Sequence, residues 1–315
     1  VHQRNWILLF VLALLVAANV AFERPVRTRE ATGRLLPGLD AARRITIEAD
    51  GEVLEIRRDT ETGGWSLPQR HGFPALTFAV DELLTRLGAL SLADRVGEER
   101  ASWERFGLGG EPARLRLDDG FGSPLADVFL GVPAAGSADG SAGRSAGCYV
   151  RPAGSETVYR AARFAVPPTA PPAWLDTRLA DFDPGAIRSV VVSHEAGRVQ
   201  LELRREGAGW RRVGNEGGEG DVPATEVERL VSIASTLYFE DVLSVEPGPA
   251  QGFGNPPETV LKLSGGADVE LWIGTPSGTG YHYATNAGWP KPWVVSLPSE
   301  STELLFAAID ALQDG

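Results

Sequence analysis

The chain carries the same series of landmarks twice, and this internal repeat constrains its fold more than any other feature. A β-like run is followed by Gly-Gly-Trp65 in the first copy and by Ala-Gly-Trp210 in the second. An amphipathic helix pattern comes next, with apolar residues at the same five offsets in both copies: Val80, Leu83, Leu84, Leu87 and Leu90, then Val227, Leu230, Val231, Ala234 and Leu237. Such self-similarity indicates duplicated structural units.

Further landmarks follow each helix in the same order. Phe106-Gly-Leu-Gly corresponds to Phe253-Gly-Asn-Pro, Leu115-Arg-Leu to Leu261-Lys-Leu, Phe129-Leu-Gly131 to Trp272-Ile-Gly274, and Tyr149-Val to Tyr283-Ala. We therefore predict two copies of one domain, at residues 41–163 and 185–297. The length of the chain agrees with about two domains.

Each copy is expected to be rich in strands. Alternating residues bounded by turn formers predict strands near 45–47, 53–58, 65–67, 112–118, 125–131, 147–152 and 157–160. The apolar spacing predicts a helix near 78–92, and a last helix within residues 298–315. Each unit is thus ββ(β)-α-βββ, a mainly antiparallel sheet with one covering helix, and the fold class is α+β.

Two segments of linker composition separate these parts. Residues 23–40 contain Arg, Gly and Pro without a clear period, and residues 164–184 are rich in Pro. A Gly/Ser/Ala stretch at 133–147 interrupts the first copy and is typical of a flexible insertion.

An apolar segment without charge runs from Trp6 to Phe22, behind a short tail at residues 1–5. At 1.5 Å per residue it spans about 26 Å, which predicts a transmembrane helix or signal anchor at residues 6–22. The alternative is a cleaved signal peptide, since Val16-Ala17-Ala18 has the small residues of a cleavage site.

The flanking charges do not settle the orientation of this segment. Arginines after the segment outnumber the one before it, so a strict positive-inside count puts the domains in the cytoplasm. Long domains translocate largely regardless of such charges, and an N-terminal apolar segment is the usual signal for export. The abundance of Ala and Gly, and of Arg over Lys, is typical of a GC-rich bacterial genome. We therefore expect a single-pass protein of a bacterial inner membrane with most of the chain extracytoplasmic.

Composition excludes several functions. The net charge of −12 argues against binding to nucleic acid. The four histidines are not paired at metal-ligand spacing, and no phosphate-binding or dinucleotide motif occurs. Gly143-Arg-Ser145-Ala-Gly147 has the letters of a nucleophile elbow but lies in the low-complexity stretch. We expect no catalytic residues, no metal and no cofactor.

Four aromatic residues form a candidate interaction surface in the second copy: Tyr281, Tyr283, Trp289 and Trp293. Exposed aromatic rings stack on sugars or anchor protein partners. The alternative is a β-hairpin whose aromatic residues pack into the core across a turn that contains Pro.

The order of these features resembles the domain of unknown function 4340 family over nearly the whole chain. The resemblance rests on an apolar segment ending in Phe22-Glu23-Arg24, two Gly-Trp units, Phe106-Gly-Leu108, Leu115-Arg-Leu117, Leu130-Gly131, and Trp174-Leu-Asp-Thr-Arg-Leu-Ala-Asp-Phe-Asp-Pro184. Phe253-Gly-Asn-Pro256 departs from the Gly-Leu of that pattern. The resemblance implies a bacterial protein, anchored by one helix and associated with ABC-2 type transporters and gliding-like auxiliary subunits. It brings no catalytic residues.

Two functions follow as expectations. The first is a non-catalytic accessory protein that contacts the bilayer through residues 6–22 and assists an ABC-type permease or its auxiliary subunit. The second is a periplasmic module that binds cell-wall glycan through the aromatic residues of the second copy.

Overall fold

The computed structural model describes residues 33–314 apart from 61–62, 92–93, 134–146, 163, 195–196 and 214–217. The predicted tail, the apolar segment at 6–22, most of the first linker and the centre of the Gly/Ser/Ala stretch lie outside the described residues. The chain divides into two compact units, residues 1–53 with 81–169 and residues 54–80 with 170–315.

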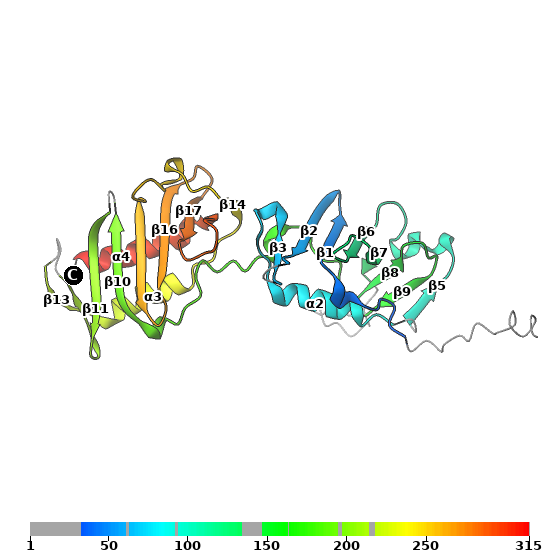
Figure 1. The fold of residues 1–315 in the computed structure, drawn as a ribbon, viewed down its shortest axis with the longest axis horizontal. Coiled ribbons are helices and arrows are strands. Elements are labelled where there is room, and N and C mark those ends of the chain that lie inside the picture. Colours follow the sequence, from blue (N-terminus) through cyan, green and yellow to red (C-terminus); the bar gives the residue numbers. More distant parts are fainter. Residues whose placement is uncertain are drawn as a thin grey trace, which may run out of the picture. The chain divides into compact units, whose positions relative to one another are not determined.

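The first sheet has nine strands in the order β4-β3-β2-β1-β6-β7-β8-β9-β5 (Figure 1). Its strands are β1 (Arg44–Ala49), β2 (Glu52–Arg58), β3 (Trp65–Leu67), β4 (Phe73–Pro74), β5 (Arg95–Gly97), β6 (Ala113–Asp118), β7 (Pro124–Pro133), β8 (Cys148–Pro152) and β9 (Val158–Ala161). The helix α2 (Thr77–Gly88) lies between β4 and β5 in the chain.

The second sheet also has nine strands, in the order β13-β12-β11-β10-β15-β16-β17-β18-β14. Its strands are β10 (Ile187–His194), β11 (Arg198–Glu206), β12 (Gly209–Arg212), β13 (Gly220–Val222), β14 (Val242–Ser244), β15 (Thr259–Gly265), β16 (Val269–Pro276), β17 (Tyr281–Asn286) and β18 (Val294–Pro298). The helices α3 (Ala224–Ser235) and α4 (Ser299–Asp314) pack against each other on one side of this sheet (Figure 1).

The two strand orders are the same when β1 is matched to β10 and each later strand to its counterpart. The helices α2 and α3 occupy the same place in the series, so the predicted internal repeat is confirmed. The fold is β-rich α+β with two antiparallel sheets, as the alternation of residues predicted.

Short 3-10 turns connect several of these elements. They are η1 (Leu39–Ala41), η2 (Pro68–Arg70), η4 (Arg100–Ser102), η5 (Glu104–Phe106), η6 (Pro171–Trp174), η7 (Pro184–Ala186) and η8 (Pro249–Gln251). Because η5 precedes β6 and η8 precedes β15, the repeat extends to the loops.

The repeated tryptophans have the same surroundings in both copies. Trp65 in β3 and Trp210 in β12 are both buried. The guanidinium of Arg58 lies over the ring of Trp65 at 5.6 Å, and that of Arg205 lies over Trp210 at 5.9 Å. In each copy the arginine is the cross-strand partner of the tryptophan. The Gly-Trp landmark therefore marks a hairpin that has the same kind of cation–π contact in both copies.

The helices end sooner than the apolar spacing predicted. The fifth landmarks, Leu90 and Leu237, lie beyond the last helical residues Gly88 and Ser235, yet both are buried. In α3 the Thr236 hydroxyl donates to the carbonyls of Ser232 and Ile233, which satisfies backbone groups that the helix end leaves unpaired. Apolar periodicity therefore continued through the turn after each helix.

Candidate interaction surfaces

Alternation along the strands gives the first sheet two chemically different faces. Ile45 and Ile47 of β1, and Leu115 and Leu117 of β6, are completely buried. Since successive side chains point to opposite faces, the residues between them lie on the other side, which we call the outer face. In β6 these residues are arginines, so the outer face of the first sheet is polar.

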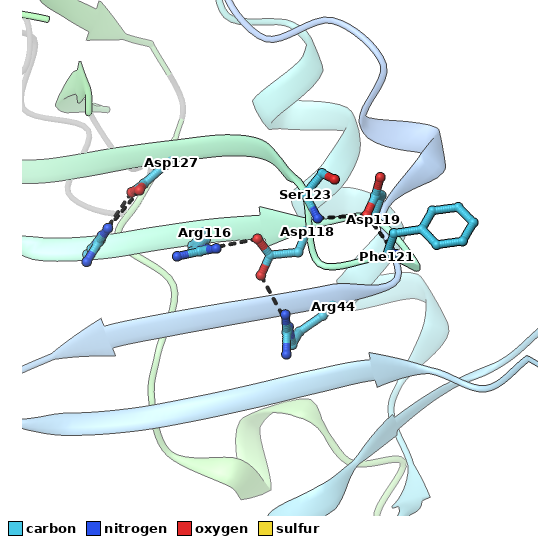
Figure 2. A network of polar contacts seen from close by, with 8 residues as sticks. Arg44, Arg116, Asp118, Asp119, Phe121, Ser123 and Asp127 are labelled. Atoms are coloured by element: carbon cyan, nitrogen blue, oxygen red, sulfur yellow. Dashed lines mark hydrogen bonds and ion pairs between the residues drawn. The ribbon is translucent and has the colours of Figure 1, made fainter. Parts of the chain in front are cut away.

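A buried carboxylate joins β1 to β6 on this outer face. The Asp118 carboxylate accepts from Arg44 Nε at 3.2 Å and from Arg116 Nε at 2.8 Å, and Figure 2 shows it between the two guanidinium groups. Asp118 is only 1% exposed, whereas both arginine side chains are partly exposed. A buried charge requires such partners, and here two cations surround one anion.

A second ion pair lies one strand further along. Arg114 donates through Nε and Nη2 to the two carboxylate oxygens of Asp127, at 2.9 and 2.7 Å. The hydrogen bond from Arg114 lowers the pKa of Asp127 below its ordinary value, and the pKa of Arg114 is raised by the same bond. This bidentate geometry fixes both side chains.

Aromatic rings and arginines alternate on the same face. The Arg151 guanidinium of β8 lies 3.8 Å from the ring centroid of Trp103 and 4.4 Å from that of Phe129. Arg100 lies over the ring of Trp103, and Arg114 over that of Phe129. Burial, followed by the nearby charge of Arg100, lowers the pKa of Arg151.

Within this stack, one buried nitrogen of Arg151 has no hydrogen-bond partner among the described residues. Arg151 Nη1 donates to the carbonyl of Ser155 at 3.1 Å, while the buried Nε has no hydrogen-bond partner. Because the two rings cover the faces of the guanidinium, cation–π attraction compensates part of its lost hydration.

The hairpin loop between β6 and β7 presents an aromatic side chain to solvent. The Asp119 carboxylate accepts from the amides of Phe121 and Ser123, each at 2.8 Å. The bond from Ser123 has the largest effect in lowering the pKa of Asp119. Phe121 is 97% exposed, and its ring points away from the sheet (Figure 2).

The outer face of the second sheet also has a cross-strand ion pair. Lys262 Nζ lies 3.0 Å from a Glu270 carboxylate oxygen. Lys262 corresponds to Arg116 and Glu270 to Asp127, whose partner in the first copy is Arg114. Trp272 Nε1 donates to Glu270 at 2.8 Å. Burial pushes the pKa of Glu270 upward, but the hydrogen bonds from Trp272 and Lys262 outweigh it and the pKa is lowered.

The structure places the four predicted aromatic residues in two separate pairs. Tyr281 and Tyr283 lie on β17 with ring centroids 5.5 Å apart, and their alternation puts them on the outer face beside Trp272 of β16. Both tyrosines are half-buried. They therefore remain accessible on the side of the sheet that α3 and α4 do not cover.

Trp289 and Trp293 lie in the connection between β17 and β18, at the far end of the hairpin from Tyr281. Trp293 is 2% exposed, and in the second unit its ring lies 4.9 Å from that of Phe73 and 6.1 Å from that of Trp289. Its Nε1 donates to the carbonyl of His71 at 3.2 Å. Trp293 therefore packs in an aromatic cluster, and the half-buried Trp289 borders it.

Sequence patterns missed two of these features. Phe121 stood between two predicted strands within Gly-Phe-Gly, and an aromatic residue at a turn is the signal that could have identified it. The stack of Arg151 on Trp103 gave no such signal, because it joins a strand to a distant turn.

The described residues contain few groups suited to chemistry. They include no cluster of three or more His, Cys, Asp or Glu side chains that could hold a metal ion. Burial raises the pKa of the Cys148 thiol to about 12, so it is not a thiolate near neutral pH. No helix within the described ranges is long and apolar enough to cross a membrane.

Comparison with known proteins places the chain in a family. The family described as a domain of unknown function (DUF4340) matches residues 65–256, which run from β3 in the first copy to the loop after η8 in the second. Neither a curated protein nor a solved structure was found to match the chain. Because the family match spans more than half of its length, the chain belongs to the DUF4340 family.

Proposed function

We propose that this protein is a non-catalytic accessory protein of a bacterial inner membrane, anchored by residues 6–22, with both sheets outside the cytoplasm. The observation that carries the proposal is the repeated outer face, where ion pairs adjoin aromatic rings in both copies. Aromatic residues and arginine are enriched where proteins bind each other. Side chains held by ion pairs lose little further freedom on binding.

An ABC-type permease or its auxiliary subunit is the partner that the family resemblance favours. A shared bilayer would confine the protein and such a partner to one surface. Confinement raises their effective concentration, so that contacts of modest area suffice for association. Two similar faces on one chain also suit a bridging role between components of an envelope complex.

A specific observation favours glycan binding as the second candidate. The rings of Tyr281 and Tyr283 stand at 89° to each other on the accessible side of β17. Aromatic rings on an accessible sheet face stack on sugar rings, and Trp272 lies on the neighbouring strand β16 of the same face. A cell-wall glycan would then occupy the outer face of the second sheet.

Purification from detergent-solubilised membranes tests the two candidates together. A tagged full chain should bring down permease or auxiliary subunits, identified by mass spectrometry. Combined Tyr281→Ala and Tyr283→Ala substitutions should reduce that recovery about tenfold, which corresponds to about 1.4 kcal/mol. Leu304→Ala is the matched control, because Leu304 is an exposed apolar residue of α4 on the other side of the sheet.

The outcomes separate the candidates. Recovery of a transporter subunit that falls only in the tyrosine variant supports the accessory role. Binding of the wild-type chain to purified peptidoglycan, without any transporter subunit, supports the glycan module instead. Equal losses in the tyrosine variant and in Leu304→Ala would show that the outer face is not the contact.

A further inference from the structure

The β6–β7 loop holds a large apolar side chain in solvent at a fixed place. The Asp119 carboxylate binds the amides of Phe121 and Ser123, and the Asp119 amide donates to the Ser123 carbonyl at 3.0 Å. Gly120 and Gly122 flank the phenylalanine, and Gly122 has a φ of 82°, which favours glycine. The loop therefore presents Phe121 without neighbouring side chains of its own.

Folding leaves the Phe121 side chain in solvent, so its burial against a partner surface would still lower the free energy. Burial of such a side chain strengthens an association about ten- to a hundredfold. Such a gain is too small to hold a free protein on a partner, but it is sufficient where a tether already keeps the two surfaces close. The loop therefore suits a contact with a surface to which the chain is already attached.

The loop lies where the chain enters the first sheet from its N-terminal side. Arg44, the first residue of β1, pairs with Asp118, the last residue of β6, and the Arg43 amide donates to the Asp118 carbonyl at 2.9 Å. Leu39 in η1 is buried, which fixes the preceding segment to the same unit. The apolar residues 6–22 come before this point, and residues 23–43 can span at most about 70 Å.

Positive charge accompanies the aromatic ring. A Cβ atom on Gly120 would lie 3.7 Å from Arg43 Cγ, and one on Gly122 would lie 3.7 Å from Arg44 Nη2, so both arginines border the loop. Two guanidinium groups, from Arg44 and Arg116, bind the Asp118 carboxylate, while Arg43 Nη1 donates to the Ala42 carbonyl. The Asp119 carboxylate accepts from backbone amides, so three arginines lie near two aspartates at the loop. A local cationic excess beside an exposed ring contrasts with the net charge of −12.

We propose that the loop at residues 119–123 is a lipid contact, in which Phe121 enters the interfacial layer of the bilayer while Arg43 and Arg44 face the lipid phosphates. Aromatic residues and arginines are the side chains that favour this layer. The inference rests on the proposed membrane anchor, because a single ring and two cations need the tether to stay bound.

Fluorescence of the full chain in liposomes tests this contact. Phe121→Cys is labelled with an environment-sensitive dye; Cys148 does not compete, because it is buried. Val53→Cys is the matched control: Val53 is 57% exposed and follows the turn at the opposite end of β1. In vesicles with equal parts of phosphatidylcholine and phosphatidylglycerol, dye at 121 should shift to shorter wavelength and be quenched several-fold by nitroxide lipids, while dye at 53 should remain unquenched.

Hydrogen exchange on the unlabelled chain excludes an effect of the dye itself. Wild type and the Phe121→Ser variant are compared in the same vesicles. The amides of residues 121 and 123 should exchange more slowly in wild type than in the variant. Equal exchange in wild type and Phe121→Ser would overturn the lipid contact. The same conclusion follows if dye at 121 is shielded only in native membranes and not in pure lipid, because the occupant is then a protein.

Flotation distinguishes a failure of this inference from a failure of the proposed function. If the full chain does not float with the vesicles, the anchor is wrong and the proposed function fails with it. If the chain floats and dye at 121 stays in a water-like environment, the anchor stands and only the lipid contact is refuted.

Discussion

Two glycines of the repeat leave no space for a side chain, and replacing them with alanine should destabilise the fold strongly. A Cβ atom at Gly131 would lie 2.0 Å from the Phe106 carbonyl oxygen and 3.1 Å from Leu108 Cγ. At the corresponding Gly274, it would lie 1.8 Å from the Gln251 carbonyl oxygen. In each copy the segment that blocks the glycine is the one before β6 or β15.

The expected cost follows from these distances. A carbon atom approaches a carbonyl oxygen to about 3.3 Å without strain, so the blocking backbone would have to retreat by more than about 1 Å. Inserting one methyl group into a packed interior costs about 1–3 kcal/mol, occasionally more. Because a backbone carbonyl cannot rotate away, we expect about 3 kcal/mol for each of Gly131→Ala and Gly274→Ala, or a fall in Tm of about 6–12 °C.

Thermal unfolding of the full chain in mild detergent, followed by tryptophan fluorescence, measures this cost. Gly88→Ala and Gly220→Ala are matched controls, because a Cβ atom at either position meets nothing within 4 Å. The controls should keep the wild-type Tm or gain slightly, since Gly→Ala in a helix or strand is worth about 0.5–1 kcal/mol. If Gly131→Ala and Gly274→Ala unfold at the same temperature as their controls, the close packing and the structural equivalence of the two positions are refuted.

Three further predictions concern single side chains. Trp293→Ala should cost about 3–5 kcal/mol in chemical denaturation because it empties a buried site, whereas Tyr283→Ala should cost below about 1 kcal/mol; similar costs would show that Trp293 is not core. The pKa of Asp119 is lowered in the folded protein, so its hydrogen bonds to the loop amides should be fully present above the ordinary aspartate pKa of about 3.9. They should weaken only as the pH falls through the lowered pKa of the folded state. The Phe121 amide signal in NMR should follow this titration, and a midpoint above about 4 would contradict it. The Cys148 thiol should react with a thiol reagent only after denaturation, and rapid labelling of the native chain at neutral pH would contradict its burial.

Much of the fold was predictable because the same physical constraint appears twice in the chain. The tryptophans Trp65 and Trp210 and the glycines Gly131 and Gly274 recur, since each serves the same hairpin or close approach in its copy. The landmarks Leu115-Arg-Leu117 and Leu261-Lys-Leu263 recur because their leucines are buried in both copies.

Other parts carried no local signal. The strands β4, β5, β13 and β14 have two or three residues, too few to show alternation. The four aromatic residues are close in sequence, and this closeness predicts a single group. The chain turns between Tyr283 and Trp289, however. Trp289 and Trp293 then pack against Phe73, which is distant in sequence, so their burial has no local signal.

Photo-crosslinking in cells tests most directly whether the outer face holds a partner. A photoreactive amino acid is placed at Tyr283 on the outer face, and at Leu304 on α4 as the control. The proposed function predicts an adduct between position 283 and an ABC-type permease or auxiliary subunit, and no adduct from position 304. An adduct from position 304 alone, or crosslinks from position 283 to cell-wall glycan and to no protein, would contradict it.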